Sequence, residues 1–564
     1  MKFEEYFSFE VIVKDLIRWR VKGKRKKDEK GRRAVEMVLP ARKMWSRAGV
    51  KEREGIAPEV VRRQAIWRTV RRVCCGHCAG VPLPLRWAQN LKRLVDEVRE
   101  AVFSGNVAFE KPRMIDIAKG REGGVMQYRK VASFDRLADR VILSRMTAYV
   151  RDRLEAVLGA RCYSFRKDRD FNHQLAVQHL QEFRARFPVG SLFVAECDIK
   201  KFFDNISHET VRRRWNEVGF EDAAGKVLEA YLSVYAVGNG QAARCPSDAE
   251  CNGQAARCPS DEECNRQAVL CPRGLPQGGS FSTVLANLVL AEADRAVERV
   301  DDGQLFYARY CDDVVFVHPD EATCRRAMEA YATALAKLDL PMHEVRPFVY
   351  RPMDGRGSPR TARPTHCVSR GSPRTEYYSI KSKGPFAWRE AGLGETDCAP
   401  WVSFLGSQVR FDGETRIRKE SIEKHIRSLG RETAEAVREL QGAALADQPR
   451  PVVREWFGRF RNRLIAKGVG YVTAKVKDCD MCWAGAFPNV TGCAETKMQM
   501  QRLDRIREGL LAKVAAMLPT RHYMTGHRYK GRPFSYYGFL EEATRPTNMN
   551  PRRVRKRILP YSEL

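Results

Sequence analysis

The sequence has no run of apolar residues long enough to cross a membrane, although the chain extends over 564 residues. A membrane-spanning helix needs about 20 consecutive, mainly apolar residues. The opening residues, Met1–Glu5, also lack the apolar core that a secretory signal peptide carries. These absences predict an intracellular protein that makes no contact with a membrane.

Acidic residues are too few to balance the basic ones. Asp and Glu together number 70, Lys and Arg number 100, and the formal net charge is +30. An excess of positive charge of this size indicates which partners a protein binds, and it says nothing about the fold. Nucleic acid is the natural polyanionic partner, because neutralising its phosphates releases counterions and so drives binding. The alternative is an ordinary soluble protein with a basic surface.

The 17 cysteines do not form the pattern of a disulfide framework, since nothing in the sequence indicates secretion. Some could bind zinc, but the two short clusters lack a matching second ligand pair nearby. A thirteen-residue repeat at about 239–271 is explained more simply as a duplicated surface loop, and zinc is therefore not expected. The groups considered are Cys74, Cys75, His77 and Cys78; Cys479, Cys482 and Cys493 with His522 or His527; and Cys245, Cys251, Cys258, Cys264 and Cys271 of the repeat.

Two adjacent aspartates stand between two apolar, aromatic-rich runs at 305–317, Leu-Phe-Tyr-Ala-Arg-Tyr-Cys-Asp-Asp-Val-Val-Phe-Val. Both runs have the composition of strands, so the sequence predicts a β-hairpin with Asp312 and Asp313 at its tip. Neighbouring carboxylates repel each other, and burying them unpaired is costly. Divalent cations would remove that cost. An ordinary exposed turn is the alternative, because Asp is common in turns.

A third aspartate ends another predicted strand. The segment at 193–206, Phe-Val-Ala-Glu-Cys-Asp-Ile-Lys-Lys-Phe-Phe-Asp-Asn-Ile, changes from apolar to polar at Asp198. One carboxylate here and two on the hairpin provide the hard oxygen ligands that suit Mg²⁺. This is the ligand set of a two-metal phosphoryl-transfer site.

At this point the chain resembles the reverse transcriptases. Tyr310-Cys311-Asp312-Asp313 is similar to their Tyr-x-Asp-Asp box, and Asp198 followed by Phe203 is similar to their first palm motif. The other similar segments occur in the family's order within about 105–440. They are Tyr163–Lys167 in the fingers, Gly274–Ser280 before the long palm helix, and Phe404-Leu405-Gly406 at the primer grip.

The resemblance implies an α+β fold, a right-hand polymerase with fingers, a palm built on an antiparallel sheet, and a helical thumb. Residues 1–104 would be a basic, mainly helical N-terminal extension. Residues 105–415 would be the fingers and palm, with insertions at about 239–271 and 354–384. Residues 416–564 would be the helical thumb and a basic C-terminal domain.

The same resemblance implies RNA-directed DNA synthesis from deoxynucleoside triphosphates. Asp198, Asp312 and Asp313 would be the catalytic residues and would hold two Mg²⁺ ions, with Mn²⁺ as an alternative and the backbone carbonyl of Ile199 as a further ligand. Phe203 would exclude a 2′-hydroxyl group. The remaining contacts implied are Gln277, Arg166 and Lys130 with the nucleotide, and Tyr310, Phe404, Leu405 and Gly406 with the primer.

Some features depart from the family. The segment 340–346, Leu-Pro-Met-His-Glu-Val-Arg, has no lysine where the family carries one that can protonate pyrophosphate, which leaves His343 and Arg346 as alternatives. The chain also has no paired Cys-x-x-Cys motifs of an intron-type endonuclease. It has no obvious acidic residue set of an integrase or a ribonuclease H.

The palm segments are similar to bacterial enzymes of the group II intron lineage, and the two extensions are more similar to prokaryotic defence-associated reverse transcriptases. That similarity implies a cytoplasmic prokaryotic enzyme in antiphage defence, with a noncoding RNA as partner, template or both. A group II intron maturase and a catalytically inactive RNA-binding relative stay open, as do a homo-oligomer and a second protein subunit. RNA would be held by basic segments whose aromatic residues stack on unpaired bases: Trp19, Trp67, Tyr523, Tyr529, Tyr536 and Tyr537.

Overall fold

The computed structural model describes most of the chain. It covers residues 1–22, 29–46, 58–75, 85–122, 125–168, 170–188, 190–236, 272–348, 382–390, 395, 397–442, 448–469, 483–490, 492–518 and 535–544. The thirteen-residue repeat and most of the second insertion lie outside these ranges. So do several residues named above: His77, Cys78, Cys479, Cys482, His522, Tyr523, His527 and Tyr529.

The N-terminal region is helical, as its sequence predicts, and the helices surround an aromatic cluster. Phe3 is almost completely buried, and its ring lies 4.8 Å from the ring of Tyr149. Through that contact the first helix packs against α6, and Trp19 and Trp67 pack against the same core. The helices are α1 (Phe3–Tyr6), α2 (Phe9–Lys22), α3 (Glu29–Met37), the 3₁₀ turn η1 (Arg42–Met44), α4 (Pro58–Cys74) and α5 (Arg86–Ser104).

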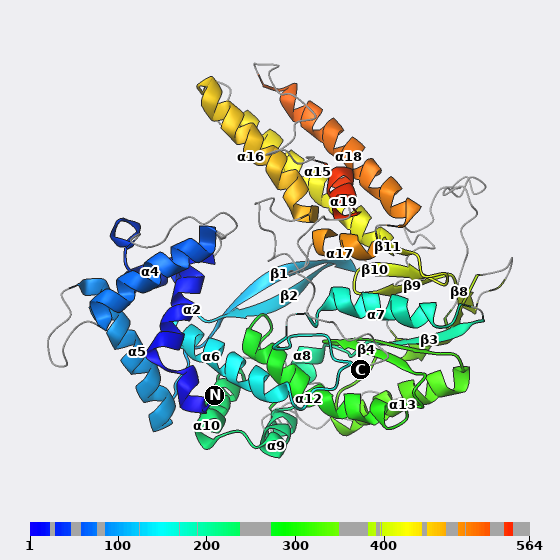
Figure 1. Ribbon diagram of the computed structural model, residues 1–564, viewed down its shortest axis with the longest axis horizontal. Coiled ribbons are helices and arrows are strands. Elements are labelled where there is room, and N and C mark those ends of the chain that lie inside the picture. The colour runs from blue at the N-terminus through cyan, green and yellow to red at the C-terminus, as the bar shows by residue number, and fades with distance from the viewer. Residues whose placement is uncertain are drawn as a thin grey trace, which may run out of the picture.

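The six-stranded central sheet lies in the right half of Figure 1. Its strands lie in the order β4-β5-β3-β7-β6, and β8 pairs with the end of β7. The four strands β4, β5, β3 and β7 are antiparallel, whereas β6 and β8 pair with β7 in parallel, so the sheet is mixed and not antiparallel throughout. The strands are β3 (Leu192–Cys197), β4 (Phe306–Tyr310), β5 (Asp313–His318), β6 (Val345–Arg346), β7 (Ser382–Trp388) and β8 (Cys398–Ala399).

Alternating side chains give this sheet two buried faces. Ala195, Tyr307 and Phe316 belong to one core, which α12 and α13 cover, and Val194 and Val315 belong to a second core under α7. Because apolar residues continue along both faces, neither face is left to solvent. The helices of this region are α6 (Leu137–Leu154), α7 (His173–Ala185), α8 (Phe202–Asn205), α9 (His208–Val218), α10 (Asp222–Ala236), α12 (Ser280–Glu298) and α13 (Glu321–Lys337).

Two smaller sheets complete the strands. An extended hairpin joins β1 (Arg113–Glu122) to β2 (Val125–Ser133), and a three-stranded sheet has the order β11-β10-β9. The latter contains β9 (Trp401–Phe404), β10 (Ser407–Arg410) and β11 (Thr415–Ile417).

The C-terminal part is a helical bundle, in the region where the resemblance implies a helical thumb. Leu429, Phe460 and Leu511 bring three of its helices together in one core, which projects away from the central sheet (Figure 1). Tyr536 is fully buried here and donates a hydrogen bond to the Leu464 carbonyl at 2.7 Å, so the expectation that it stacks on RNA is wrong. The helices are α15 (Lys419–Gly442), α16 (Arg450–Val469), α17 (Trp483–Val490), α18 (Ala494–Ala515) and α19 (Tyr536–Thr544). No helix of the described chain is both long and apolar enough to span a membrane.

Candidate active site

The predicted hairpin is present, and the aspartate pair lies at its tip. Tyr310 pairs with Asp313, so Cys311 and Asp312 form a two-residue turn between β4 and β5. Cys311 has a φ of 61°. Two-residue hairpin loops often require a positive φ, and glycine usually fills that position because it has no Cβ to clash. A cysteine there must be held by its surroundings.

The third aspartate lies beside this tip. Strand β3 runs antiparallel to β5 with Cys197 opposite Val314, so Asp198 follows directly at the same end of the sheet as the hairpin turn. Its backbone is fixed from two sides. The Asp198 N–H donates to Ser382 Oγ at 3.1 Å, and the His343 N–H donates to the Asp198 carbonyl at 3.0 Å. Ile199, which follows it, is buried and forms an isolated bridge with Met342.

The carboxylates influence each other electrostatically. Burial raises the pKa of Asp312 above its ordinary value, and the negative charge of Asp198 raises it further, while Arg129 acts in the opposite direction. A nearby positive charge would stabilise the charged form of Asp312 in this environment. Asp198 Oδ2 also lies 4.0 Å from Nε2 of His343.

The aspartates fit a magnesium site that substrate completes. Among the residues described, no three His, Cys, Asp or Glu side chains are gathered closely enough to form a full ligand cage. Mg²⁺ does not need such a cage, because it keeps several waters and is usually bound by one or two carboxylates together with substrate phosphates. The mutual repulsion of Asp198 and Asp312 supports that fit.

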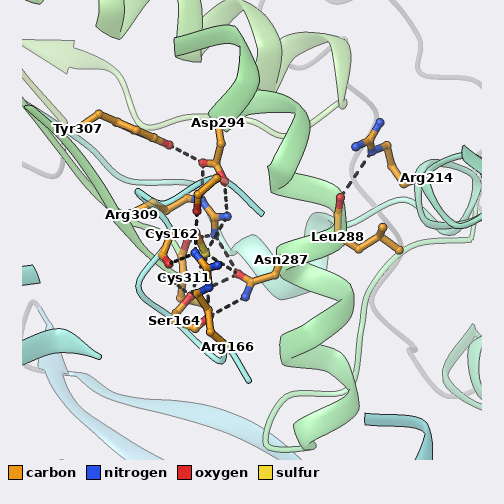
Figure 2. A network of polar contacts seen from close by, with 11 residues as sticks. Cys162, Ser164, Arg166, Arg214, Asn287, Leu288, Asp294, Tyr307, Arg309 and Cys311 are labelled. Carbon is orange, nitrogen blue, oxygen red and sulfur yellow. Dashed lines mark hydrogen bonds and ion pairs between the residues drawn. The ribbon is translucent and has the colours of Figure 1, made fainter. Parts of the chain in front are cut away.

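A buried polar network lies beneath the turn (Figure 2). Arg309 is completely buried, and its Nε and Nη2 atoms donate to the two carboxylate oxygens of Asp294 at 2.7 Å and 2.5 Å. Burial alone would lower the pKa of Arg309, but the Asp294 carboxylate reverses this and holds it above its ordinary value. Tyr307 donates to the same carboxylate at 2.6 Å. The Asp294 carboxylate therefore compensates the buried charge of Arg309.

The loop that contains Gln277 is hydrogen-bonded both to Phe203 and to the β1–β2 hairpin. Leu275 N–H donates to the Phe203 carbonyl at 2.8 Å, and Ala132 N–H donates to the Gln277 carbonyl at 2.8 Å. Gly278 has a φ of 94°, and a Cβ there would collide with Val131. The structure shows why this loop needs glycine. It also places the Gln277 side chain within hydrogen-bond distance of Asp204, the residue after Phe203.

Arg166 and Lys130, the two basic residues predicted to contact the nucleotide, lie in different surroundings. Arg166 donates to Glu155 Oε1 at 2.9 Å and 2.7 Å, and to the Gly159 carbonyl at 2.7 Å. Lys130 is exposed and lies opposite Asp116 on the hairpin, whereas Arg129 lies opposite Ile117. Neighbouring strand residues point to opposite faces. The positive charge of Arg129 lowers the pKa of Asp312, and Lys130, the next residue of the strand, points to the opposite face of the hairpin.

The segment expected to be the primer grip forms the turn between β9 and β10. Phe404 is buried and pairs with Ser407, so Leu405 and Gly406 make a two-residue loop. Their φ values are 48° and 84°. This turn belongs to the three-stranded sheet and not to the central sheet that carries Tyr310 and the aspartates.

A comparison with known protein families gives a match for the central part of the chain. Residues 121–345 match the protein family described as reverse transcriptase (RNA-dependent DNA polymerase). No curated protein sequence matches the chain significantly.

Two of the solved structures that align with the chain are telomerases. One, from Candida albicans in complex with a fragment of telomeric RNA, aligns at 12% identity over 86% of this chain and 76% of its own, with a TM-score of 0.32. An apo telomerase from Candida tropicalis, truncated at its C-terminal domain, aligns at 10% identity over 74% of this chain and 82% of its own, with a TM-score of 0.30. TM-scores this low do not define a shared fold, so the assignment rests on the family match. Residues 121–345 of this chain are similar to the reverse transcriptase domain.

Proposed function

We propose that the protein is an RNA-directed DNA polymerase that joins deoxynucleoside triphosphates to a primer. The observation that carries this proposal is the position of Asp198 and the Asp312–Asp313 pair at one end of two adjacent strands inside the matched domain. The central sheet with α12 and α13 would be the palm, the β1–β2 hairpin part of the fingers, and α15 to α19 the thumb.

In this proposal, Asp198, Asp312, Asp313 and the carbonyl of Ile199 hold two Mg²⁺ ions. The bound ions would supply a lower pKa for the primer hydroxyl and charge neutralisation for the leaving pyrophosphate. Arg129 is a further candidate for nucleotide binding beside Arg166 and Lys130, because its positive charge lowers the pKa of Asp312. Gln277 positions the nucleotide, and Tyr310 orients the primer end.

The direct test is primer extension. Purified protein, an RNA template, a DNA primer and Mg²⁺ should give a product whose sequence is complementary to the template. Product that forms only on a DNA template, or whose sequence ignores the template, would reject the proposal. A protein that binds RNA without extending any primer would support the catalytically inactive alternative.

Changing Phe203 to Ala should allow ribonucleotides to be incorporated. The Phe203 ring is only partly buried, and its backbone is tied to the Gln277 loop, so the ring can contact the sugar of an incoming nucleotide. Removing it should relax the preference for deoxyribose by roughly ten- to a hundredfold, since a lost steric contact of this kind is worth about 1–3 kcal/mol. The measurement is competition between ribo- and deoxyribonucleoside triphosphates on one primer.

The neighbouring Phe202 provides the control. Its ring lies 5.2 Å from that of Phe203 but is buried in the core. Phe202→Leu should lower stability without altering the choice of sugar. A Phe203→Ala variant that retains the original preference would show that another residue excludes the 2′-hydroxyl.

We also propose that the protein binds one dedicated RNA, and this proposal rests on the positive charge of the chain. In addition to the net charge of +30, α4 carries the exposed residues Arg62, Arg71 and Arg72. Purified protein should carry one dominant RNA that survives a high-salt wash, whereas nonspecific binding weakens steeply with salt. Changing the three arginines to Ala should reduce the RNA recovered, and Arg325→Ala on α13 should not.

The identity of that RNA also decides between the subtypes. Intron sequence would indicate a maturase, and a structured noncoding RNA would agree with the antiphage role that the resemblance implies. A random sample of cellular RNA, or none, would contradict a dedicated partner.

A further inference from the structure

Two residues near the candidate catalytic turn have left-handed backbone conformations without being glycine. Phe165 has a φ of 56° and Cys311 a φ of 61°. Such conformations are costly for residues with a Cβ and persist only where the surrounding structure enforces them. The two are close together, because the Phe165 ring lies 6.1 Å from the ring of Tyr310.

Both backbone polar groups of Cys311 are held by buried side chains. Its N–H donates to Ser164 Oγ at 3.0 Å, and its carbonyl accepts from Nη1 of Arg309 at 3.4 Å. Ser164 and Arg309 are completely buried and come from segments far apart in the sequence. The turn is therefore fixed on two sides, at the residue where it departs most from an ordinary backbone.

Asn287 of α12 connects these two side chains (Figure 2). Its Oδ1 accepts from Nη1 of Arg309 at 3.0 Å and from Ser164 Oγ at 3.2 Å, and its Nδ2 donates to the Ser164 carbonyl at 2.7 Å. Asp294, two turns further along the same helix, binds the rest of the Arg309 guanidinium. One helix thus anchors the segment around Ser164 and the strand that leads into the turn.

We propose that Ser164, Asn287, Asp294 and Arg309 are positioning residues that hold Cys311 left-handed and thereby aim Asp312. This inference rests on the proposed polymerase function. The hydrogen bonds described here do not involve the side chains of Asp198, Asp312 or Asp313, so the network can keep its geometry whether those carboxylates are bound or not. An aspartate that must meet both a metal and a substrate gains from such preorganisation, because small misplacements at a reacting centre are costly.

The test is Ser164→Ala, which removes one hydrogen bond to Cys311 and leaves the turn sequence unchanged. Amide hydrogen exchange at Cys311 should become roughly two- to tenfold faster, the equivalent of one ordinary hydrogen bond. The kcat for nucleotide incorporation should fall roughly ten- to a hundredfold. The KM for the nucleotide should change little, because Ser164 is buried and its hydroxyl binds the backbone N–H of Cys311.

A second variant separates positioning from general stability. Glycine adopts a positive φ without support, so in a Cys311→Gly background the Ser164→Ala change should cost much less in kcat than it does alone. Strictly additive losses would overturn the proposal, as would unchanged exchange at Cys311. Tyr6→Phe is the matched control, because it removes a buried hydroxyl that donates to Asp152 at 2.8 Å on α6, and it should leave kcat unaltered.

The exchange measurement does not depend on activity. If the wild-type protein extends no primer, the polymerase function fails, while faster exchange in Ser164→Ala still shows that the network holds the turn. If wild-type protein is active and Ser164→Ala exchanges and reacts as wild type does, the positioning role fails and the polymerase function stands.

Discussion

Changing Asp312 and Asp313 together to Asn should reduce nucleotide incorporation below detection in the presence of Mg²⁺. Amide oxygens are weaker ligands than carboxylates, and the two changes remove two of the three negative charges that would balance the cations. The fold should survive. The pKa of Asp312 is raised by burial and by Asp198, which means that its charged form is unfavourable in the folded chain. A neutral side chain should therefore leave the Tm unchanged or slightly higher.

The control for this experiment removes the same charge elsewhere. Asp222 on α10 and Glu329 on α13 are both exposed, and the Asp222→Asn, Glu329→Gln variant should polymerise as the wild type does. Incorporation that persists in the Asp312, Asp313 variant would reject these carboxylates as catalytic residues. A loss of activity in both variants would point to total charge, and so to template binding, as the cause.

Asp294→Ala should be strongly destabilising. It would leave the fully buried guanidinium of Arg309 without its carboxylate partner and would remove the acceptor of the Tyr307 hydroxyl. Breaking a buried ion pair from one side typically costs about 3–5 kcal/mol, because the remaining charge is no longer compensated. The measurement is the denaturant midpoint of the first unfolding transition, followed by circular dichroism.

Two comparisons make that result interpretable. Replacing both partners, Asp294→Leu with Arg309→Met, should recover most of the stability, because no buried charge is left unpaired. The exposed pair of Arg325 and Glu321 on α13, 2.6 Å apart, should by contrast contribute roughly 0–1 kcal/mol. If Asp294→Ala were no worse than Glu321→Gln, the ion pair could not be what secures the core beneath the turn.

The positions of Asp198, Asp312 and Asp313 at strand ends could be predicted from the sequence, because the patterns that indicate them are local. An apolar run that ends at Asp198, and two runs that flank Asp312 and Asp313, specify strands and a turn without knowledge of the rest of the chain. The helical bundle was equally predictable from the spacing of residues such as Ile422 and Leu429, both of which are buried.

What could not be predicted depends on partners distant in sequence. The pattern of the β1–β2 strands alternates, but nothing in it says whether Arg129 or Lys130 faces the aspartates. Arg166 looks suited to phosphate, yet Glu155 and two carbonyl groups already accept its hydrogen bonds. Tyr536 lies in a basic region, and only tertiary packing shows that it belongs to the core.

Strand β7 begins at Ser382, so the last residues of the expected 354–384 insertion belong to the central sheet. There Ser382 accepts from the Asp198 N–H at 3.1 Å, and Lys383 binds Glu196 at 2.5 Å. Val345 of β6 lies beside Ser382, so the chain leaves and re-enters the sheet at neighbouring positions.

The neighbouring positions of Val345 in β6 and Ser382 in β7 have an evolutionary consequence. Lengthening a loop whose ends are already fixed costs only about 0.6 kcal/mol for each doubling of its length. The segment between β6 and β7 can therefore gain or lose sequence between relatives while Asp198 stays where it is. A lineage could acquire a new specificity at this place and leave the candidate catalytic carboxylates undisturbed.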